Sequence, residues 1–354
     1  MNRSWRLAWA HGSAEVQSLG AMLGPLSLRV GAGRDLEIMH VAPWAGMTRA
    51  DKLPGIMRRL RGEWPCVPFG CTEPPHGLPA SWRTHAPDDA WNHGYAANHH
   101  WRCVSADERR IHLAIDYPAS SPIEHIEREI AADPEGPAVD IVLRVWARRP
   151  ARLPAGLHPT FRVPPSAGRV RVLLGPHDGI FSYPAQPAGA VSRLLPDQRS
   201  HSLAHLPGVD GNVDLAHLPL AAPAEELLQV RALEAPGVAT PGVATPGVAA
   251  PGAPFALHYL DYDACVGLWW DTAQLPDLLL WVSNGGRIHF PWMGNHLALG
   301  AEPVNSLFDL GRIATAPAGH PLADRLGIAI SPDAPWETRY RIAAWPQACS
   351  PTSS

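Results

Sequence analysis

The sequence predicts an all-β protein built from antiparallel strands, and three observations support that prediction. Segments in which apolar and polar residues alternate recur along the 354 residues, whereas segments with helical periodicity are scarce. The 31 Gly and 39 Pro residues make up about a fifth of the chain, which implies many turns. The regular alternation of strands and helices typical of a doubly wound sheet is missing. An antiparallel sandwich or barrel is therefore the better interpretation.

Four segments carry the clearest strand signals. In residues 139–148 every second residue is apolar, as expected for a half-buried strand, and residues 169–174 repeat this pattern. Residues 110–116 follow it more weakly. Residues 278–283 form a continuous apolar run closed by Asn-Gly-Gly at 284–286, which predicts a buried strand followed by a tight turn.

One short helical turn and one insertion are also expected. Pro223 and the acidic residues after it suit the start of a helix, so residues 223–228 are expected to open a short helical turn. Residues 235–254 repeat a five-residue Pro-Gly-Val-Ala-Thr unit, which is too short for a solenoid repeat. Strand-like sequence flanks this stretch on both sides. We therefore expect residues 1–354 to form a single domain with an exposed low-complexity loop at about 235–254.

Composition excludes several classes of protein. The net charge of −4 gives no basic face of the kind that binds nucleic acid. Lys52 is the only lysine, which excludes a lysine Schiff base unless Lys52 lies in the site. The five cysteines include no CxxC pair, and no run of eighteen apolar residues or secretory leader is apparent. We expect a cytoplasmic monomer or homodimer without nucleic-acid or membrane partners.

Glu302 is the first candidate functional residue. It is the only carboxylate between Ile288 and Val304, and that stretch contains no Lys or Arg to pair with it. Apolar surroundings disfavour the ionised form and raise a carboxyl pKa toward the range useful for proton transfer. The alternative interpretation is a turn residue whose side chain reaches solvent between two strands.

Two histidines have informative neighbours. His76 lies between Pro75 and Gly77, and His158 follows the strand expected to end near Arg149. Taken alone, each is more typical of a surface or hydrogen-bonded structural histidine, because a neutral imidazole both donates and accepts. A functional role for either histidine therefore requires other functional residues beside it in the fold.

A metal site is not expected. His93, His99 and His100 form a local histidine cluster, but they lack the ligand spacing of motifs such as HExxH. Adjacent histidines on a strand also point to opposite faces.

Tryptophan is unusually frequent, with 14 Trp against 6 Phe and 6 Tyr. Indole rings are platforms for flat, partly apolar ligands and keep an N–H to donate, a description that sugars fit. Trp281 and Trp292 are the candidates for such a stacking wall, although either could instead fill the core.

Several motifs, taken in order, resemble the aldose 1-epimerase (mutarotase) family of the galactose mutarotase-like superfamily. They span about residues 20–345 and comprise Arg61-Gly62 with Pro68 and Gly70, His76-Gly77, residues 156–161, residues 276–286 and residues 299–304. The resemblance implies a large antiparallel β-supersandwich with few short helices.

The resemblance also implies roles for individual residues. Glu302 corresponds to the family's catalytic base and His158 to its catalytic acid. His76 corresponds to an earlier histidine that assists at the ring oxygen or hydrogen-bonds the sugar. Arg61 corresponds to a substrate-contacting arginine, and Asp178 to a substrate-binding aspartate.

The sequence departs from the family pattern at two places that bear on the sugar. Ala80 stands where many members have an Arg, and Arg83, three residues later, is the available substitute. Thr160 stands where an aromatic residue often follows the catalytic histidine. These departures leave the identity of the sugar open.

The expected activity is interconversion of the α and β anomers of a free aldose. Ionised Glu302 would take the C1 hydroxyl proton and protonated His158 would deliver one to the ring oxygen, from opposite sides of the hemiacetal. No cofactor or metal is required. One alternative is a non-catalytic carbohydrate-binding protein on the same fold. Another is a hexose-phosphate epimerase, in which Arg61 or Arg83 would hold the phosphate.

Overall fold

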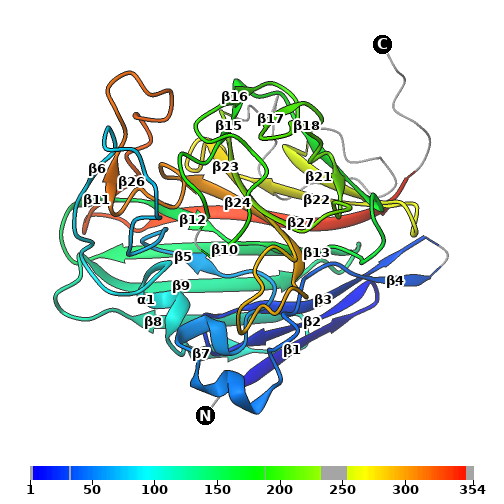
Figure 1. The fold of residues 1–354 in the computed structure, drawn as a ribbon. Coiled ribbons are helices and arrows are strands. Elements are labelled where there is room, and N and C mark those ends of the chain that lie inside the picture. The colour runs from blue at the N-terminus through cyan, green and yellow to red at the C-terminus, as the bar shows by residue number, and fades with distance from the viewer. Residues whose placement is uncertain (1–2, 32, 188, 233–252, 348–354) are drawn as a thin grey trace.

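Two large antiparallel sheets form the body of the protein. The structure is a computed structural model that describes residues 3–31, 33–187, 189–232 and 253–347. The sheets have nine and eight strands, and a four-stranded sheet from the N-terminal region packs against the first of them. Figure 1 shows these N-terminal strands in blue below the long strands of the nine-stranded sheet, in which the red strand is β27. The expected all-β antiparallel fold is confirmed.

The nine-stranded sheet contains the longest strands. In spatial order its members are β19 (His217–Leu218), β14 (Val170–Leu174), β21 (Phe255–Tyr259), β22 (Ala264–Trp270), β27 (Trp336–Pro346), β10 (Ala138–Ala147), β9 (Ile123–Ala132), β8 (Arg110–Asp116) and β7 (Arg102–Ala106). Strands β10, β14 and β8 coincide with three of the segments predicted from alternation. The burial of β10 alternates along most of its length, because one face packs on the core and the other faces outward.

The eight-stranded sheet carries the candidate site. Its members in spatial order are β16 (Arg199–Ser200), β15 (Gly179–Ser182), β20 (Ala224–Arg231), β23 (Asp277–Asn284), β24 (Leu297–Asn305), β12 (Ala155–Leu157) and β5 (Pro65–Cys66), with β13 (Thr160–Arg162) also paired to β24. Every residue of β23 is buried. Leu278 and Leu280 join the main core on one face, whereas Leu279 and Trp281 join a second, aromatic-rich cluster on the other. Because both faces are covered, β23 is a continuous apolar run in the sequence.

The remaining elements are short. The N-terminal sheet comprises β1 (Ser4–Trp9), β2 (Gly12–Gln17), β3 (Leu23–Val30) and β4 (Arg34–Glu37). Three two-stranded pairs are β11 (Ala151–Leu153) with β26 (Ile328–Ile330), β17 (Leu206–Gly208) with β18 (Gly211–Val213), and β25 (Ala314–Thr315) with β6 (Arg83–Thr84). The helices of the described residues are η1 (Thr48–Lys52), η2 (Gly55–Arg58) and α1 (Gly94–Asn98).

The prediction of a helical turn at residues 223–228 is wrong, because residues 224–228 lie in strand β20. The two acidic residues do not face solvent at a helix start. The Glu225 carboxylate accepts hydrogen bonds from Trp281 Nε1 and Ser283 Oγ. The neighbouring Glu226 accepts from Ser192 Oγ and the Arg193 amide. Partners distant in sequence therefore satisfy both acids within a sheet.

The tight turn expected at residues 284–286 is also not observed. Strands β23 and β24 are joined by a longer loop, residues 285–296, whose ends are closed by a hydrogen bond from the Gly285 amide to the His296 carbonyl. Gly285 has a positive φ of 70°, which lets the chain leave the strand sharply. This loop supplies Arg287 and Trp292 to the candidate site.

Most of the expected insertion, residues 235–252, lies outside the described residues. The strands that flank it, β20 and β21, belong to different sheets. Within the described part of the chain, no helix has the length and apolar character needed to cross a membrane.

Candidate active site

Strand pairing places Glu302 beside Trp281 on one face of the eight-stranded sheet. In the antiparallel pair β23–β24, Leu279 lies opposite Glu302 and Trp281 lies opposite Gly300. Residues two apart along a strand share a face, so Leu279, Trp281, Gly300 and Glu302 all face the aromatic-rich cluster. A register shift of one residue would turn the Glu302 carboxylate toward the main core instead.

The absent side chain of Gly300 makes room for this arrangement. A Cβ atom at Gly300 would lie 2.6 Å from Glu302 Oε1 and 3.1 Å from Trp281 Cβ. Both distances are too short for ordinary van der Waals contact. Glycine at this position therefore lets the carboxylate and the indole lie side by side.

His158 is held on the same wall by the link between β12 and β13. Its amide donates to the Trp64 carbonyl at 2.9 Å, and its ring stacks on the Trp64 indole with centroids 4.1 Å apart. The Nδ1 atom hydrogen-bonds to Thr160 Oγ1 at 3.2 Å, so the threonine at this position orients the imidazole. The Nε2 atom lies 3.3 Å from Glu302 Oε1.

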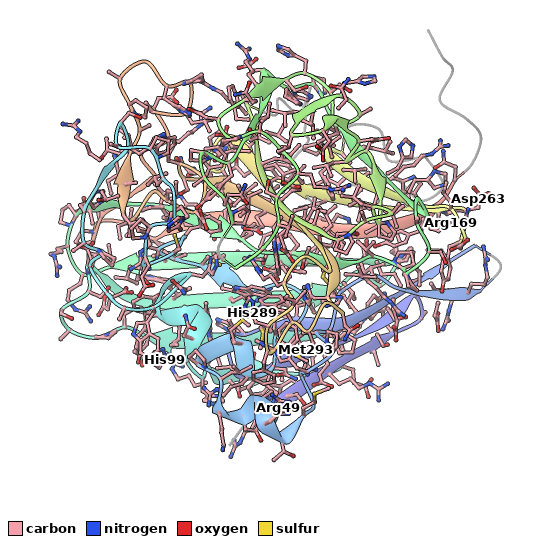
Figure 2. All side chains as sticks on the ribbon, viewed as in Figure 1. Arg49, His99, Arg169, Asp263, His289 and Met293 are labelled. Atoms are coloured by element: carbon pink, nitrogen blue, oxygen red, sulfur yellow. The ribbon has the colours of Figure 1, made fainter. Side chains whose placement is uncertain are left out.

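A cavity of about 440 Å³ opens over this pair. This volume is within the usual range for small-molecule sites, roughly 300–1,000 Å³. Tryptophans 64, 281 and 292 line its walls, and its polar lining includes His93, His158, Arg287, Glu302 and Asp309. At the mouth, Trp91 is 37% exposed and His289, labelled in Figure 2, is also exposed.

Burial favours the neutral form of both members of the pair. It raises the pKa of Glu302 well above its usual value, and the negative charge of Asp309 raises it further. It lowers the pKa of His158 well below its usual value, and the neighbouring His93 lowers it further. Burial therefore favours a carboxylic acid beside a neutral imidazole, whereas the sequence analysis expected an ionised Glu302 and a protonated His158 on opposite sides of the sugar.

His93 is a site residue that the sequence analysis considered only as a metal ligand. Its ring meets that of His158 edge-on with centroids 5.1 Å apart, and burial lowers its pKa to about 4. It precedes α1 in a left-handed conformation, with φ of 60°. At the next residue, Gly94, a Cβ would lie 2.6 Å from the Val67 carbonyl oxygen. The available signal was a His-Gly dipeptide at 93–94, of the same kind as that at 76–77.

Arg287 is the arginine that lines the cavity. Its guanidinium lies over Trp292 at 4.6 Å and over Trp281 at 5.5 Å from the ring centroids. Its NH1 atom is 3.7 Å from Oε2 of Glu225, which also accepts the Trp281 Nε1 hydrogen bond. Glu225 therefore links the cation and the indole from behind the cavity wall. Sequence reasoning missed Arg287 because only the loop's conformation brings it to the site.

Four residues expected in the site do not line the cavity. His76 is exposed in a turn, and Arg83 is exposed on β6. Asp178 is exposed beside β15. Arg61 is partly buried and donates from Nε to the Arg59 carbonyl. The structure thus brings together Glu302, His158, Trp281 and Trp292 from the expected set.

No metal cluster is found at the histidines. Among the residues that the structure describes, no group of three or more His, Cys, Asp or Glu side chains is arranged to hold a metal ion. His99 stacks on Tyr95, and His100 hydrogen-bonds to Ser18. These contacts direct the two rings to different partners.

Comparison with known proteins identifies the fold. No protein-family model and no curated protein matches the sequence. Among solved structures, a candidate aldose 1-epimerase from Escherichia coli K12 aligns with a TM-score of 0.61 at 14% identity, covering 97% of this chain and 99% of that one. A GalM/aldose epimerase homologue from C. elegans aligns with a TM-score of 0.59 at 10% identity, covering 97% and 99%. A galactose mutarotase related enzyme from Lactobacillus acidophilus gives 0.57 at 13% identity, covering 97% of each chain.

The chain therefore has the galactose mutarotase-like β-sandwich fold over nearly its whole length. The resemblance expected from the sequence motifs is confirmed at the level of the fold. At identities of 10–14% the match carries no statement about activity, which has to be argued from the site itself.

Proposed function

We propose that the protein is an aldose 1-epimerase, which interconverts the α and β anomers of a free aldose. The observation that carries this proposal is the 3.3 Å contact between Glu302 Oε1 and His158 Nε2 at the buried end of a tryptophan-lined cavity. Anomer exchange requires one group that accepts a proton and one that donates it, both facing the same hemiacetal. A carboxyl and an imidazole that hold one proton between them supply both functions.

The proposed cycle moves two protons and breaks one bond. When the sugar binds, its C1 hydroxyl donates to Glu302, and the shared proton passes to His158. Glu302 then takes the C1 hydroxyl proton, the C1–O5 bond breaks as the C1 carbonyl forms, and His158 Nε2 gives its proton to O5. Rotation about C1–C2 and the reverse transfers close the other anomer.

His93 supports this cycle from behind the imidazole. Its pKa of about 4 keeps it neutral at neutral pH. A neutral His93 packed edge-on against His158 holds that ring in place, whereas a positively charged His93 would oppose protonation of His158 during the reaction. Each positioned acid or base typically contributes about 10²–10⁴-fold to the rate.

The charges around the cavity favour a neutral aldose over a sugar phosphate. Among the described residues, Arg287 is the only Arg or Lys that lines the cavity, and it already faces two indoles and Glu225. Glu302 and Asp309 line the same space. A phosphate dianion would need additional cations. A neutral aldose can instead donate hydrogen bonds from its hydroxyl groups to the carboxyl groups and stack the apolar face of its ring on tryptophan.

The decisive measurement is the rate of anomer exchange. Freshly dissolved α-glucose, α-galactose, other aldoses and glucose 6-phosphate are followed by optical rotation and NMR, with wild type and Glu302→Gln. We expect wild type to accelerate equilibration of at least one unphosphorylated aldose, and Glu302→Gln to lower kcat by about 100-fold or more.

Two other outcomes are informative. Sugar binding without acceleration of any aldose would favour a carbohydrate-binding protein on this fold. Acceleration confined to the phosphorylated sugar would favour a hexose-phosphate epimerase and contradict the charge argument.

A further inference from the structure

We propose that Asp309 is the specificity-determining residue of the cavity, and that its carboxylate accepts a hydrogen bond from a ring hydroxyl of the aldose. This inference rests on the proposed function. Asp309 follows β24 in the loop that leads to β25 and lines the same cavity as Glu302 and His158. Nothing in the local sequence distinguished it from a loop aspartate.

The carboxyl group of Asp309 lines the cavity and has one fixed hydrogen-bond donor, the hydroxyl of Tyr183. The Tyr183 hydroxyl donates to Oδ1 at 2.8 Å. Within the described ranges, neither Oδ1 nor Oδ2 forms an ion pair with an Arg, Lys or His side chain within 4.0 Å. A partly buried carboxylate that lacks a cation gains most from further hydrogen-bond donors, and sugar hydroxyls are such donors.

The backbone at Asp309 is held by the segment that follows β5. The Asp309 carbonyl accepts hydrogen bonds from the Cys71 amide at 2.8 Å and from the Cys71 thiol at 3.2 Å. Gly70 lies against the same carbonyl with a positive φ of 116°, and a Cβ there would lie 2.4 Å from its oxygen. Such close packing pre-organises the carboxylate, so little freedom is lost when it binds a hydroxyl.

The position of Asp309 also links specificity to chemistry. Burial raises the pKa of Asp309 as it does that of Glu302, and the charge of ionised Asp309 raises the pKa of Glu302 further. A hydroxyl bound at Asp309 would orient the sugar ring while Trp281 and Trp292 face its apolar surface. The same carboxylate thus supplies a binding contact and makes Glu302 a stronger base.

The test separates binding from catalysis. Asp309→Asn keeps the size and can still accept from Tyr183, whereas Asp309→Ala removes the acceptor. We expect KM for the best aldose to rise about 10- to 100-fold in Asp309→Ala, with a smaller rise in Asp309→Asn. Asp210→Asn, in the exposed turn between β17 and β18, serves as the matched control and should leave KM unchanged.

Deoxy sugars identify the hydroxyl. The ratio of wild-type to Asp309→Ala kcat/KM is measured for glucose and for its 2-, 3-, 4- and 6-deoxy analogues. The ratio should fall to near one for the analogue that lacks the bound hydroxyl and stay high for the others. A ratio that is equal for all analogues would overturn the hydroxyl contact, because a merely structural role would affect every sugar alike.

The outcomes also distinguish this inference from the proposed function. An active wild type with unchanged KM in both Asp309 variants overturns the role of Asp309 and leaves the epimerase proposal standing. A wild type that neither binds nor equilibrates any aldose, as judged by ligand-observed NMR and polarimetry, overturns both. A shift of the acidic limb of the kcat/KM profile to lower pH in Asp309→Asn is expected in addition, because Glu302 loses a neighbouring negative charge.

Discussion

Nε2 of His158 lies 3.3 Å from Oε1 of Glu302, so the proposed acid and base contact each other directly at the cavity. The sequence analysis expected them on opposite sides of a sugar ring. Direct contact lets one proton pass between them, so the pair can begin a reaction cycle from a neutral state. A sugar that enters the cavity then competes for the hydrogen bonds that the two groups make with each other.

Substituting His93 and His76 in turn tests which of the two histidines belongs to the active site. His93→Asn should lower kcat by about 10-fold or more, because the ring packed against His158 is lost. His76→Ala should keep wild-type activity, since His76 is exposed and does not line the cavity. Both rates are measured by polarimetry. Loss of activity in His76→Ala with full activity in His93→Asn would restore the sequence-based assignment.

Glu225 is expected to affect sugar binding by positioning Arg287 and Trp281. Glu225→Gln removes the charge that faces Arg287 and weakens the bond to Trp281 Nε1, so we expect KM to rise several-fold with a smaller effect on kcat. The intrinsic tryptophan fluorescence should change as well. Glu226→Gln is the matched control, because Glu226 is equally buried but bonds to Ser192 and Arg193. Equal effects of the two variants on KM would contradict a specific role.

His40 should make the fold sensitive to acid. It is 8% exposed and packs edge-on against His296, and burial, with a smaller effect of Arg162, lowers its pKa from 6.5 to about 4. Between these values the unfolded chain binds the extra proton and the folded protein does not. The contribution to stability is therefore present above pH 6.5 and is lost as the pH falls toward 4.

The corresponding measurement compares urea unfolding at pH 7 and pH 5. One histidine with this shift accounts for about 2 kcal/mol of lost stability at pH 5, so His40→Gln should lose about that much less than wild type over the same interval. An identical pH dependence in the two proteins would show that His40 titrates normally.

Substitutions in a buried ion pair of the core should strongly lower the free energy of unfolding. Arg128 and Glu63 are both fully buried and pair with each other, and Tyr340 donates to Glu63 Oε1 at 2.7 Å. Arg128→Met leaves Glu63 buried without a cation, so we expect a loss of about 3–5 kcal/mol in the free energy of unfolding. Adding Glu63→Gln should recover part of it. The exposed pair Arg29–Asp35 is the control, and Arg29→Met should cost less than about 1 kcal/mol.

The sequence predicted the sheets better than the loops, for a physical reason. Alternation along β10 and the apolar run of β23 follow directly from which faces are buried, so pattern reading identified both. Glu302 stood out because its neighbourhood lacks cations. His76 and His93, by contrast, both lie in His-Gly dipeptides, and only tertiary structure decides which one reaches the cavity. Local sequence contains no such information.

Arg287 and Asp309 illustrate the same limit. Each lies in a loop, and its direction depends on contacts with residues distant in the chain, Glu225 for Arg287 and Tyr183 for Asp309. The acids of β20 misled the helix prediction because their partners are distant in the sequence, on strand β23 for Glu225 and in a loop for Glu226. Tertiary contacts overrode local preference at each of these positions.

Some residues of the cavity lie on strands and others on loops, and this division affects how the substrate specificity of such a protein can evolve. Strand pairing within one sheet sets Glu302 and Trp281 beside each other, whereas Arg287, His93 and Asp309 arrive on segments outside the long strands. Replacing one of those segments would alter which sugar is held without disturbing the sheet. The reacting groups would thus be inherited with the framework, while substrate choice could diverge independently, segment by segment.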